Sequence, residues 1–404
     1  MPEIRIEGYQ PVYQALCNPH LKQSLYDAGA VIMADTLLTL HGQEHTRRRH
    51  LALRVFQRDF ARHYEHAVFP ATVARTLGHF QGRNPLDLVA FGHSVTMNLT
   101  ADFAGIDRSG DPEETARLLG LVQKFGEGAT MVHSTRDLAV LTAEVQRALG
   151  EYERDFLQPS LARRQRLLAE FARGDLTEDR LPRDMLTVLL RNEDRLELSP
   201  EVLSREIAFY LQAGSHSTAN ATVHAVDELL RWSRGFPDRR QALEADPLFL
   251  QRAVHEALRL HPASPVAWRR AVSPLTLPSG VAVTPEDLLV LDLAAANVDQ
   301  TVFGPDSQRF NPYREISARR VQPFGLTFGL GVHNCLGRDL DAGLAPQADT
   351  QAEDHQFGTV TALVRVVLCD LGAMEAPDDP PRRDDHSVRG NWQRFPVRVR
   401  YPQF

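Results

Sequence analysis

Apolar positions recur every three or four residues through most of the first 260 positions of the chain, with short polar joints between the segments. This spacing is typical of amphipathic helices, so we predict a helical Arg- and His-rich run over 43–62 and a pair of long helical segments over 113–173. The sequence Ser-Pro-Glu at 199–201 supplies a capping serine, a proline at the first helical position and an acid in the first turn. The helix that begins there is predicted to run to Trp232.

A second helix is bounded by local signals at both ends. It begins at Asp246 and Pro247 and ends near His261, because Pro262 disfavours continuation. Residues 265–294 then change to short apolar runs separated by proline and glycine, which predicts a small sheet. The pattern as a whole indicates a mainly α protein with a small β region.

Length and composition are those of a globular chain. It has 404 residues, of which 43% are hydrophobic and 24% are charged, and this excludes disordered and low-complexity classes. No linker-like stretch divides it, and the polar, irregular segment 341–358 is predicted to be a surface insertion. We therefore expect a single domain over 1–404 with a short N-terminus.

Charge and cysteine content narrow the functional classes. A net charge of −7 gives no overall electrostatic attraction for nucleic acid. The chain contains no run of about 18 apolar residues and no secretory signal pattern, so we expect a cytoplasmic protein that does not enter a membrane. Cys17, Cys335 and Cys369 are far apart and odd in number, which argues against a disulfide framework and leaves a cysteine available for chemistry.

Cys335 lies in the glycine-rich stretch 328–337, FGLGVHNCLG, directly before a predicted helix. Glycines allow the backbone to turn N–H groups toward a sulfur atom, and the positive end of a helix favours the thiolate. This setting suits a thiolate metal ligand, since hydrogen bonds tune the electron density on sulfur. The alternative is a structural loop cysteine beside turn glycines.

The pattern FGxGxHxCxG is complete in this stretch and resembles the haem-ligand signature of the cytochrome P450 family. The resemblance implies a cytochrome P450 fold with a single haem domain and haem b, iron protoporphyrin IX, as the cofactor. It further implies that Cys335 is the axial thiolate ligand of the iron and that His333 lies near a haem propionate.

Glu256 and Arg259 share one helix face and can form an ion pair, which in most proteins is a weak surface contact. Residues 305–312, PDSQRFNP, lie between this pair and the cysteine loop and resemble the PxRF region of the family. The resemblance implies a buried structural network of Glu256, Arg259 and Arg309, in which one carboxylate satisfies two guanidinium groups.

Basic residues for an anionic cofactor are expected elsewhere in the chain. His45 and Arg49 are four residues apart and face the same way on a helix, and the pattern HxxxR resembles the propionate-binding helix of the family. A solvated basic face is the alternative. Arg269 is favoured over Arg270 as a third propionate partner, from its spacing to residues 275–277.

The long helix contains a cluster of small residues, AGSHST at 213–218, although glycine and serine disfavour a helix interior. The cluster resembles the family's AGx(D/E)T site, where an acid and an alcohol organise proton delivery to oxygen. His216 occupies the acid position and Ser217 the alcohol position, so both are candidate catalytic residues. Two alternatives stay open: His216 pairs with backbone or solvent, or Thr218, about 100° further around the helix, is the active alcohol.

The resemblance implies a monooxygenase that takes two electrons from a reductant and inserts one oxygen atom of dioxygen into an organic substrate. The segments expected to line its pocket are mostly apolar, so we expect a small hydrophobic substrate in contact with Ala213, Val266 and Ala267. Ferredoxin and an NAD(P)H-linked ferredoxin reductase are the electron donors that the family implies.

Other interpretations fit the same sequence. The His216–Ser217 pair is also compatible with a thiolate-haem enzyme that does not use the usual oxygen activation, such as a peroxide-driven oxidase, a coupling enzyme or an isomerase. A non-catalytic haem-binding protein is a further alternative. Either a docking site for an acidic partner or an ordinary solvated patch is expected at Arg319, Arg320 and Arg338.

Overall fold

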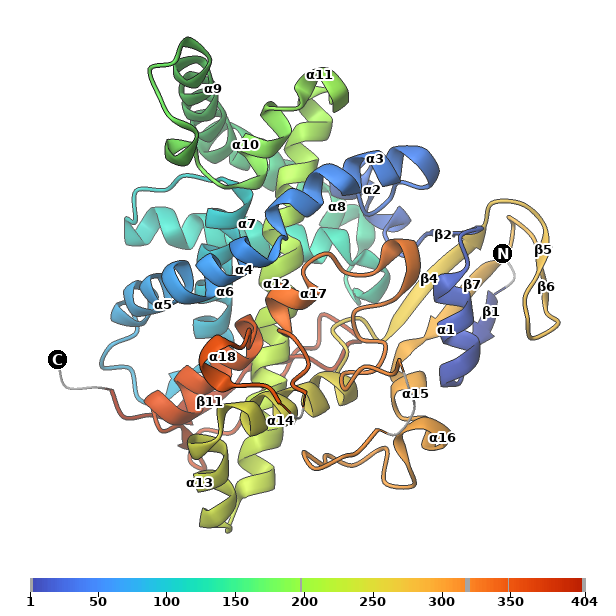
Figure 1. The fold of residues 1–404 in the computed structure, drawn as a ribbon, viewed down its shortest axis with the longest axis vertical. Helices are drawn as coiled ribbons and strands as arrows, with labels where there is room; N and C mark the ends of the chain where they lie inside the picture. Colours follow the sequence, from blue (N-terminus) through green and yellow to red (C-terminus); the bar gives the residue numbers. More distant parts are fainter. Residues whose placement is uncertain (1–2, 197, 317–319, 348, 402–404) are drawn as a thin grey trace. The chain divides into compact units, whose positions relative to one another are not determined.

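Segments that alternate along the chain form two units in this computed structural model (Figure 1). The structure describes residues 3–196, 198–316, 320–347 and 349–401. Unit 1 consists of Met1–Leu25, Phe80–Gly92 and Ser217–Phe404, and unit 2 consists of Tyr26–His79 and His93–His216. Two helices contribute residues to both units: α6 (Leu88–Ala104) and α12 (Pro200–Ser233). That residues 1–404 make a single haem domain stays a prediction.

Unit 2 is built from helices. Besides its parts of α6 and α12 they are α2 (Ala30–Met33), α3 (Gly42–Ala52), α4 (Arg58–His63), α5 (Phe69–Gly78), α7 (Pro112–Ala129), α8 (Leu138–Tyr152), α9 (Gln158–Arg173), α10 (Met185–Leu190) and α11 (Glu193–Leu196). The run predicted over 43–62 forms α3 and α4 with a break between them, and the pair predicted over 113–173 forms α7 and then α8 with α9. Asp111 and Asp137 cap α7 and α8 by accepting hydrogen bonds from N–H groups of the first turn.

Unit 1 contains the described strands. The largest sheet has the order β1 (Glu3–Ile6), β7 (Leu288–Asp292), β4 (Val266–Ala271) and β2 (Leu21–Gln23). Strand β1 runs parallel to β7, and the other neighbours are antiparallel. Two smaller sheets pair β5 (Leu275–Thr276) with β6 (Ala282–Val283) and β9 (Arg382–Arg383) with β10 (Trp392–Arg394). In a third, β11 (Pro396–Arg398) lies between β3 (Leu86–Asp87) and β8 (Met374–Glu375). The short strands predicted within 265–294 are confirmed as β4 to β7.

The largest sheet packs against α1 (Tyr9–Cys17), which lies beside it in Figure 1. Val12 and Leu16 of α1 share a buried core with Leu289 and Leu291 of β7. The side chains alternate along β4, so that Ala267, Arg269 and Ala271 are buried while their neighbours are partly exposed. This alternation decides which side chains of β4 face the interior of unit 1.

The remaining helices of unit 1 are α13 (Pro237–Ala245), α14 (Pro247–Leu260), α15 (Leu293–Asn297), α16 (Gln300–Phe303), α17 (Arg338–Asp341) and α18 (Thr359–Arg365). The bounds of α12 and α14 confirm the two helices that capping residues and prolines predict. Ser199 Oγ accepts a hydrogen bond from Val202 N, and Asp246 Oδ1 accepts one from Phe249 N. Helices therefore dominate, as expected for a mainly α fold. Every helix among the described residues is too short or too polar to span a bilayer.

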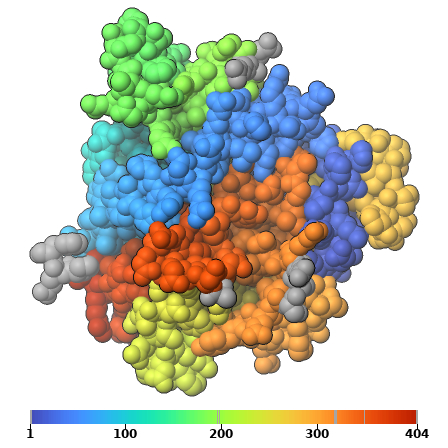
Figure 2. Space-filling model, in the orientation of Figure 1, coloured from blue at the N-terminus to red at the C-terminus, as the bar shows by residue number. Residues whose placement is uncertain are grey.

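The segment 341–358 is held together at its two ends. A Cβ atom on Gly358 would lie 2.2 Å from the backbone nitrogen of Gly343. The backbone segments at 343 and 358 therefore approach each other so closely that no side chain fits at Gly358. Gln251 Nε2 of α14 donates to Phe357 O at 3.0 Å, which fixes one end against that helix. The middle, around residue 350, is exposed and forms part of the surface drawn in orange-red in Figure 2. The segment is thus exposed in its middle and buried at its ends.

Candidate functional site

The cysteine loop is a series of tight turns. Cys335 N donates to Phe328 O at 2.8 Å, and Gly329 N donates to Leu326 O at 2.8 Å. Gly331 has a φ of +69°, and a Cβ there would lie 2.5 Å from Leu16 O of α1. Glycine is therefore required at this position both for its backbone conformation and for the close approach to α1. The loop presents Cys335 as an exposed residue.

Asn297, the last residue of α15, ties the loop to α14. Its Oδ1 accepts from Leu326 N at 2.7 Å, and its Nδ2 donates to the carbonyl of Arg259 at 3.0 Å and to Thr327 Oγ1 at 3.0 Å. Gly325 allows this contact, because a Cβ there would lie 2.3 Å from Asn297 Oδ1. Sequence reasoning missed Asn297; the available signal is a single amide in the otherwise apolar run 293–297.

Glu256 and Arg259 form a buried bidentate ion pair on α14. Arg259 Nε and Nη2 donate to the two carboxylate oxygens of Glu256 at 2.8 and 2.7 Å. The exposed fraction is 0% for Arg259 and 4% for Glu256. Arg259 Nη1 also donates to the carbonyls of Asn297 at 2.6 Å and Ser307 at 2.7 Å. The pair therefore fixes two backbone segments that precede the cysteine loop in the sequence, at Asn297 and Ser307.

The second arginine of this network is Arg314, and the prediction of Arg309 is wrong. Arg314 Nε donates to Glu256 Oε1 at 3.0 Å, and its Nη1 lies 2.7 Å from Asp306 Oδ1. Arg309 is exposed, and among the described residues its carbonyl is the part that enters the network, by accepting from Arg314 Nη2 at 3.0 Å. The chain turns at residues 306–309, where Arg309 N donates to Asp306 O. The side chain of Arg309 is exposed at this turn, and Arg314, five residues later, reaches Glu256.

The basic residues of unit 1 expected near an anionic cofactor are Arg269 and His333. Arg269 is buried on β4, while Arg270 lies on the other face of the strand and is partly exposed. Arg269 Nη1 donates to Gln23 Oε1 at 2.5 Å and to the carbonyl of Trp268 at 2.9 Å. His333 ends the 3₁₀ turn Gly331–His333, two residues before Cys335.

His45 and Arg49 belong to α3 of unit 2. His45 is buried, and its pKa is lowered to about 4 by burial and then by the positive charges of Arg49 and His41. Arg49 and His41 therefore lie close enough to His45 to disfavour its protonated form. That His45 and Arg49 bind an anionic group stays a prediction.

Arg48 of the same helix takes part in a buried network that sequence reasoning missed. Its Nη1 donates to Glu206 Oε2 at 3.3 Å, and the same oxygen accepts from Leu37 N at 2.8 Å. Glu206 is buried on α12, and burial raises the pKa of its carboxyl. The network joins α3, α12 and the segment before α3 inside unit 2.

The small-residue cluster is an accessible stretch on an otherwise buried helix. From Ile207 to Leu230 of α12, the side chains that are not buried are at 213, 214, 216, 217 and 228. The predicted residues Ala213, His216 and Ser217 therefore share the accessible part of the helix. Gly214 has a packing reason as well, since a Cβ there would lie 2.8 Å from Thr100 Cγ2 of α6.

His216 and Thr218 point to different neighbours. The ring of His216 lies 5.5 Å from the ring of His93, whose pKa burial lowers to about 4. Thr218 is buried, and its Oγ1 donates to Asp341 Oδ1 at 2.7 Å. Ser217 is the more accessible of the two candidate alcohols.

The remaining predicted positions are less informative. Val266 and Ala267 begin β4, the first partly exposed and the second buried. Arg319 lies outside the described residues. Arg320 is exposed, and Arg338 Nε lies 2.7 Å from the carboxylate of Asp339.

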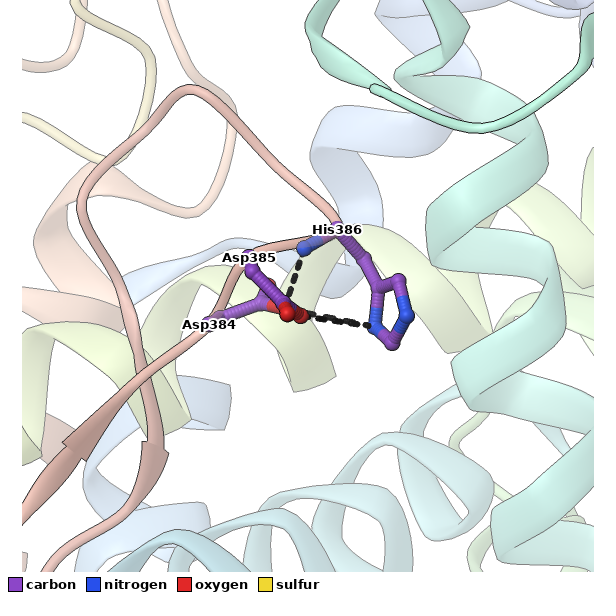
Figure 3. Close-up of side chains that lie close together, drawn as sticks. All are labelled: Asp384, Asp385 and His386. Carbon is purple, nitrogen blue, oxygen red and sulfur yellow. Dashed lines mark hydrogen bonds and ion pairs between the residues drawn. The ribbon is translucent and has the colours of Figure 1, made fainter.

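Two other features could be mistaken for sites. In unit 2, a cavity of about 380 Å³ has several charged residues in its lining. Two of them, Arg108 and Asp102, form an ion pair at 2.9 Å. None of the predicted site residues lines this cavity. In the loop before β10, Asp384, Asp385 and His386 bring one possible ligand atom each within 4.8 Å of one another (Figure 3). An exposed acidic group of this kind, with a hydrogen bond from His386 N to Asp384, does not by itself indicate a metal.

The cysteine loop lies in a segment that matches a known protein family. The family model described as Cytochrome P450 matches residues 241–341. The vitamin D(3) 25-hydroxylase of Pseudonocardia autotrophica is 34% identical over 164 residues, 40% of this chain and 37% of that protein. Cytochrome P450 CYP107DY1 of Priestia megaterium is 24% identical over 309 residues, 75% of this chain and 65% of that protein. The chain thus aligns with less than two thirds of each of these relatives.

Solved structures cover more of the chain. P450BioI, in complex with acyl carrier protein ligated to hexadec-9Z-enoic acid, has a TM-score of 0.73 at 20% identity and covers 98% of this chain and 92% of that chain. Epothilone D-bound cytochrome P450epoK has a TM-score of 0.72 at 20% identity and covers 99% of this chain and 91% of that chain. The family model, these relatives and the fold of these solved structures all support assignment of the chain to the cytochrome P450 family.

Proposed function

We propose that this chain is a haem-thiolate monooxygenase that inserts one oxygen atom of dioxygen into a small, largely apolar organic substrate. The observation that carries the proposal is the cysteine loop: a complete FGxGxHxCxG pattern, turned by left-handed glycines, presents an exposed Cys335. The residues just before the loop are fixed by Asn297, whose carbonyl accepts a hydrogen bond from Arg259 of the buried Glu256–Arg259 pair.

The donor set fits haem b, the cofactor of the family. A cysteine sulfur is a soft ligand suited to iron, and the two propionates require cationic or N–H donors. We assign the iron to Cys335 and the propionates to His45, Arg49, Arg269 and His333. When bound, haem supplies the redox chemistry and the site of dioxygen activation.

The residues of α12 would handle protons. The Ser217 hydroxyl can donate a hydrogen bond and accept another, so it can hold a water or pass a proton inward. The His216 imidazole can accept a proton at one ring nitrogen and release one at the other near neutral pH. Both side chains are on the accessible stretch of α12, where small neighbours leave room for a ligand.

Ser217→Ala is expected to lower the amount of oxidised product per NAD(P)H consumed by roughly 10²-fold, because proton transfer by a positioned group contributes at least that much. His216→Phe tests the imidazole in the same assay. Ser215→Ala is the matched control, since Ser215 is buried on the same helix beside Thr96. Unchanged coupling in both Ser217→Ala and His216→Phe would remove these residues from the mechanism.

An apolar substrate is supported by the residues assigned to it. Ala213, Val266 and Ala267 offer hydrocarbon surface only, and burial of apolar surface drives the binding of such ligands. One relative is a vitamin D(3) 25-hydroxylase, and one solved structure with this fold has epothilone D bound. In a binding screen, hydrophobic compounds should shift the Soret band of the holoprotein; a shift produced only by charged compounds would contradict this substrate class.

Electrons are proposed to come from separate partners, ferredoxin and an NAD(P)H-linked ferredoxin reductase, in the cytoplasm. Exposed cations such as Arg320 would attract an acidic partner. The neighbouring P450BioI structure contains an acyl carrier protein, so a carrier-bound substrate is a second class of partner to test. Substrate-dependent NAD(P)H consumption with ferredoxin and reductase is the expected result.

A second candidate function is favoured by one specific observation. The position of the usual acid holds His216, whose ring packs near a buried neutral imidazole, His93. An enzyme that takes its oxygen from peroxide, or that couples or isomerises its substrate, does not need the acid. Turnover with peroxide and none with dioxygen and redox partners would select this candidate.

A further inference from the structure

A partly buried contact joins α12 to the short helix that follows the cysteine loop. Helix α17 begins three residues after Cys335 and ends at Asp341, and Thr218 Oγ1 of α12 donates to Asp341 Oδ1 at 2.7 Å. Thr218 has an exposed fraction of 4%, and both residues belong to unit 1. The function assigned above uses neither side chain.

The carboxyl of Asp341 faces no cation among the described residues. On its own helix, Arg338 pairs with the partly exposed Asp339. From α14, His255 Nε2 lies 2.8 Å from the carbonyl of Ala342, and burial lowers the pKa of His255 to about 4, so this ring is neutral near pH 7. From α18, Thr359 donates to the carbonyl of Leu340.

Asp341 therefore titrates in an unusual range. Burial raises the pKa of its carboxyl to about 6, and the hydrogen bond from Thr218 acts in the opposite direction by stabilising the ionised form. The group is neutral in mildly acidic solution and negative in mildly alkaline solution. Ionisation of Asp341 therefore changes the charge on the helix that follows Cys335.

We propose that Asp341, held by Thr218, is a positioning residue whose negative charge lowers the reduction potential of haem iron bound at Cys335. Asp341 is six residues from Cys335, a stretch of chain that reaches at most about 20 Å, so its charge acts on the iron through space, and the effect grows as the distance shortens. One-electron reduction by an external donor adds a negative charge at the iron, so it is coupled to proton uptake by the carboxylate from solvent. The inference rests on the proposed haem-thiolate function.

The coupling has a definite sign. As the pH rises through the pKa of Asp341, the carboxylate forms and the potential of the wild-type holoprotein falls, and above that pKa this contribution is constant. Asp341→Asn keeps an oxygen that accepts from Thr218 but cannot ionise. This variant is expected to lose this pH dependence and to have a higher potential than wild type in alkaline solution.

The experiment is an equilibrium redox titration of the purified holoproteins, with dithionite and mediator dyes, from about pH 5 to about pH 8. Thr218→Val removes the hydrogen bond to the ionised form, so it is expected to shift the midpoint of the pH dependence to higher pH. Asp339→Asn is the matched control on the same helix, and it is expected to follow wild type because Asp339 is paired with Arg338 and partly exposed. If Asp341→Asn fails to bind haem, the shift in Thr218→Val decides the question.

Two results would overturn the inference: an Asp341→Asn potential with the pH dependence of wild type, or a Thr218→Val midpoint that does not move. The carbon monoxide spectrum of each reduced protein separates this failure from failure of the proposed function. A strongly red-shifted Soret band together with either result rejects only the role of Asp341. Absence of that band in the wild type rejects the haem-thiolate function and the role of Asp341 with it.

Discussion

Glu256→Ala is expected to lower the free energy of unfolding by about 3–5 kcal/mol, which is the typical cost of leaving a buried charge without its partner. The substitution leaves the guanidinium of Arg259, which has an exposed fraction of 0%, and that of Arg314 without their shared carboxylate. Domains are usually stable by only about 5–15 kcal/mol, so the variant is expected to have a low yield and a much lower urea midpoint. Urea unfolding followed by circular dichroism measures the effect.

The two nearby arginines supply a matched comparison. Arg314→Ala removes one of the hydrogen bonds to a buried carboxylate and is expected to cost about 1–3 kcal/mol. Arg309→Ala removes an exposed side chain and is expected to stay within about 0.5 kcal/mol of wild type. The opposite order, with Arg309→Ala the more damaging, would contradict the network described here.

Cys335→Ser is expected to abolish oxidation of the substrate and the strongly red-shifted band of the reduced, carbon monoxide-treated protein. A serine hydroxyl is a far weaker electron donor than a thiolate, and the electron density of the thiolate favours cleavage of the O–O bond. The fold should survive, because the loop is held by backbone hydrogen bonds and by Asn297 rather than by the sulfur. Absorption spectra and turnover assays measure both effects.

The other cysteines provide the controls. Cys17 is exposed at the end of α1, and Cys369 is partly exposed after α18. Burial raises the pKa of both thiols, which keeps them protonated near neutral pH. Cys17→Ser and Cys369→Ser should keep the spectrum and the activity, and loss of the red-shifted band in either of them would contradict the assignment of Cys335.

The features that the sequence predicts correctly are those set by local signals. Helices α12 and α14 begin at a capping residue followed by proline, and α14 ends before Pro262, so a few neighbouring residues decide their bounds. Pairing of Glu256 with Arg259 follows from their spacing on one helix. The strands between 265 and 294 follow from short apolar runs between turn residues.

The features that the sequence does not reveal depend on contacts between distant segments. A turn at residues 306–309 decides that Arg314, and not Arg309, reaches Glu256. Asn297 meets residue 326, and Thr218 meets Asp341, across separations that no local periodicity encodes. The buried ends of the segment 341–358 likewise depend on Gln251 of α14, which is about 100 residues away in the sequence.

The absorption spectrum of the dithionite-reduced, carbon monoxide-treated protein tests the central claim most directly. A strongly red-shifted Soret band is expected, because it requires both bound haem and a thiolate on the iron. A protein that binds haem but lacks this band would have Cys335 protonated or displaced, which would contradict the monooxygenase proposal. A protein that binds no haem would contradict the assignment of the whole site.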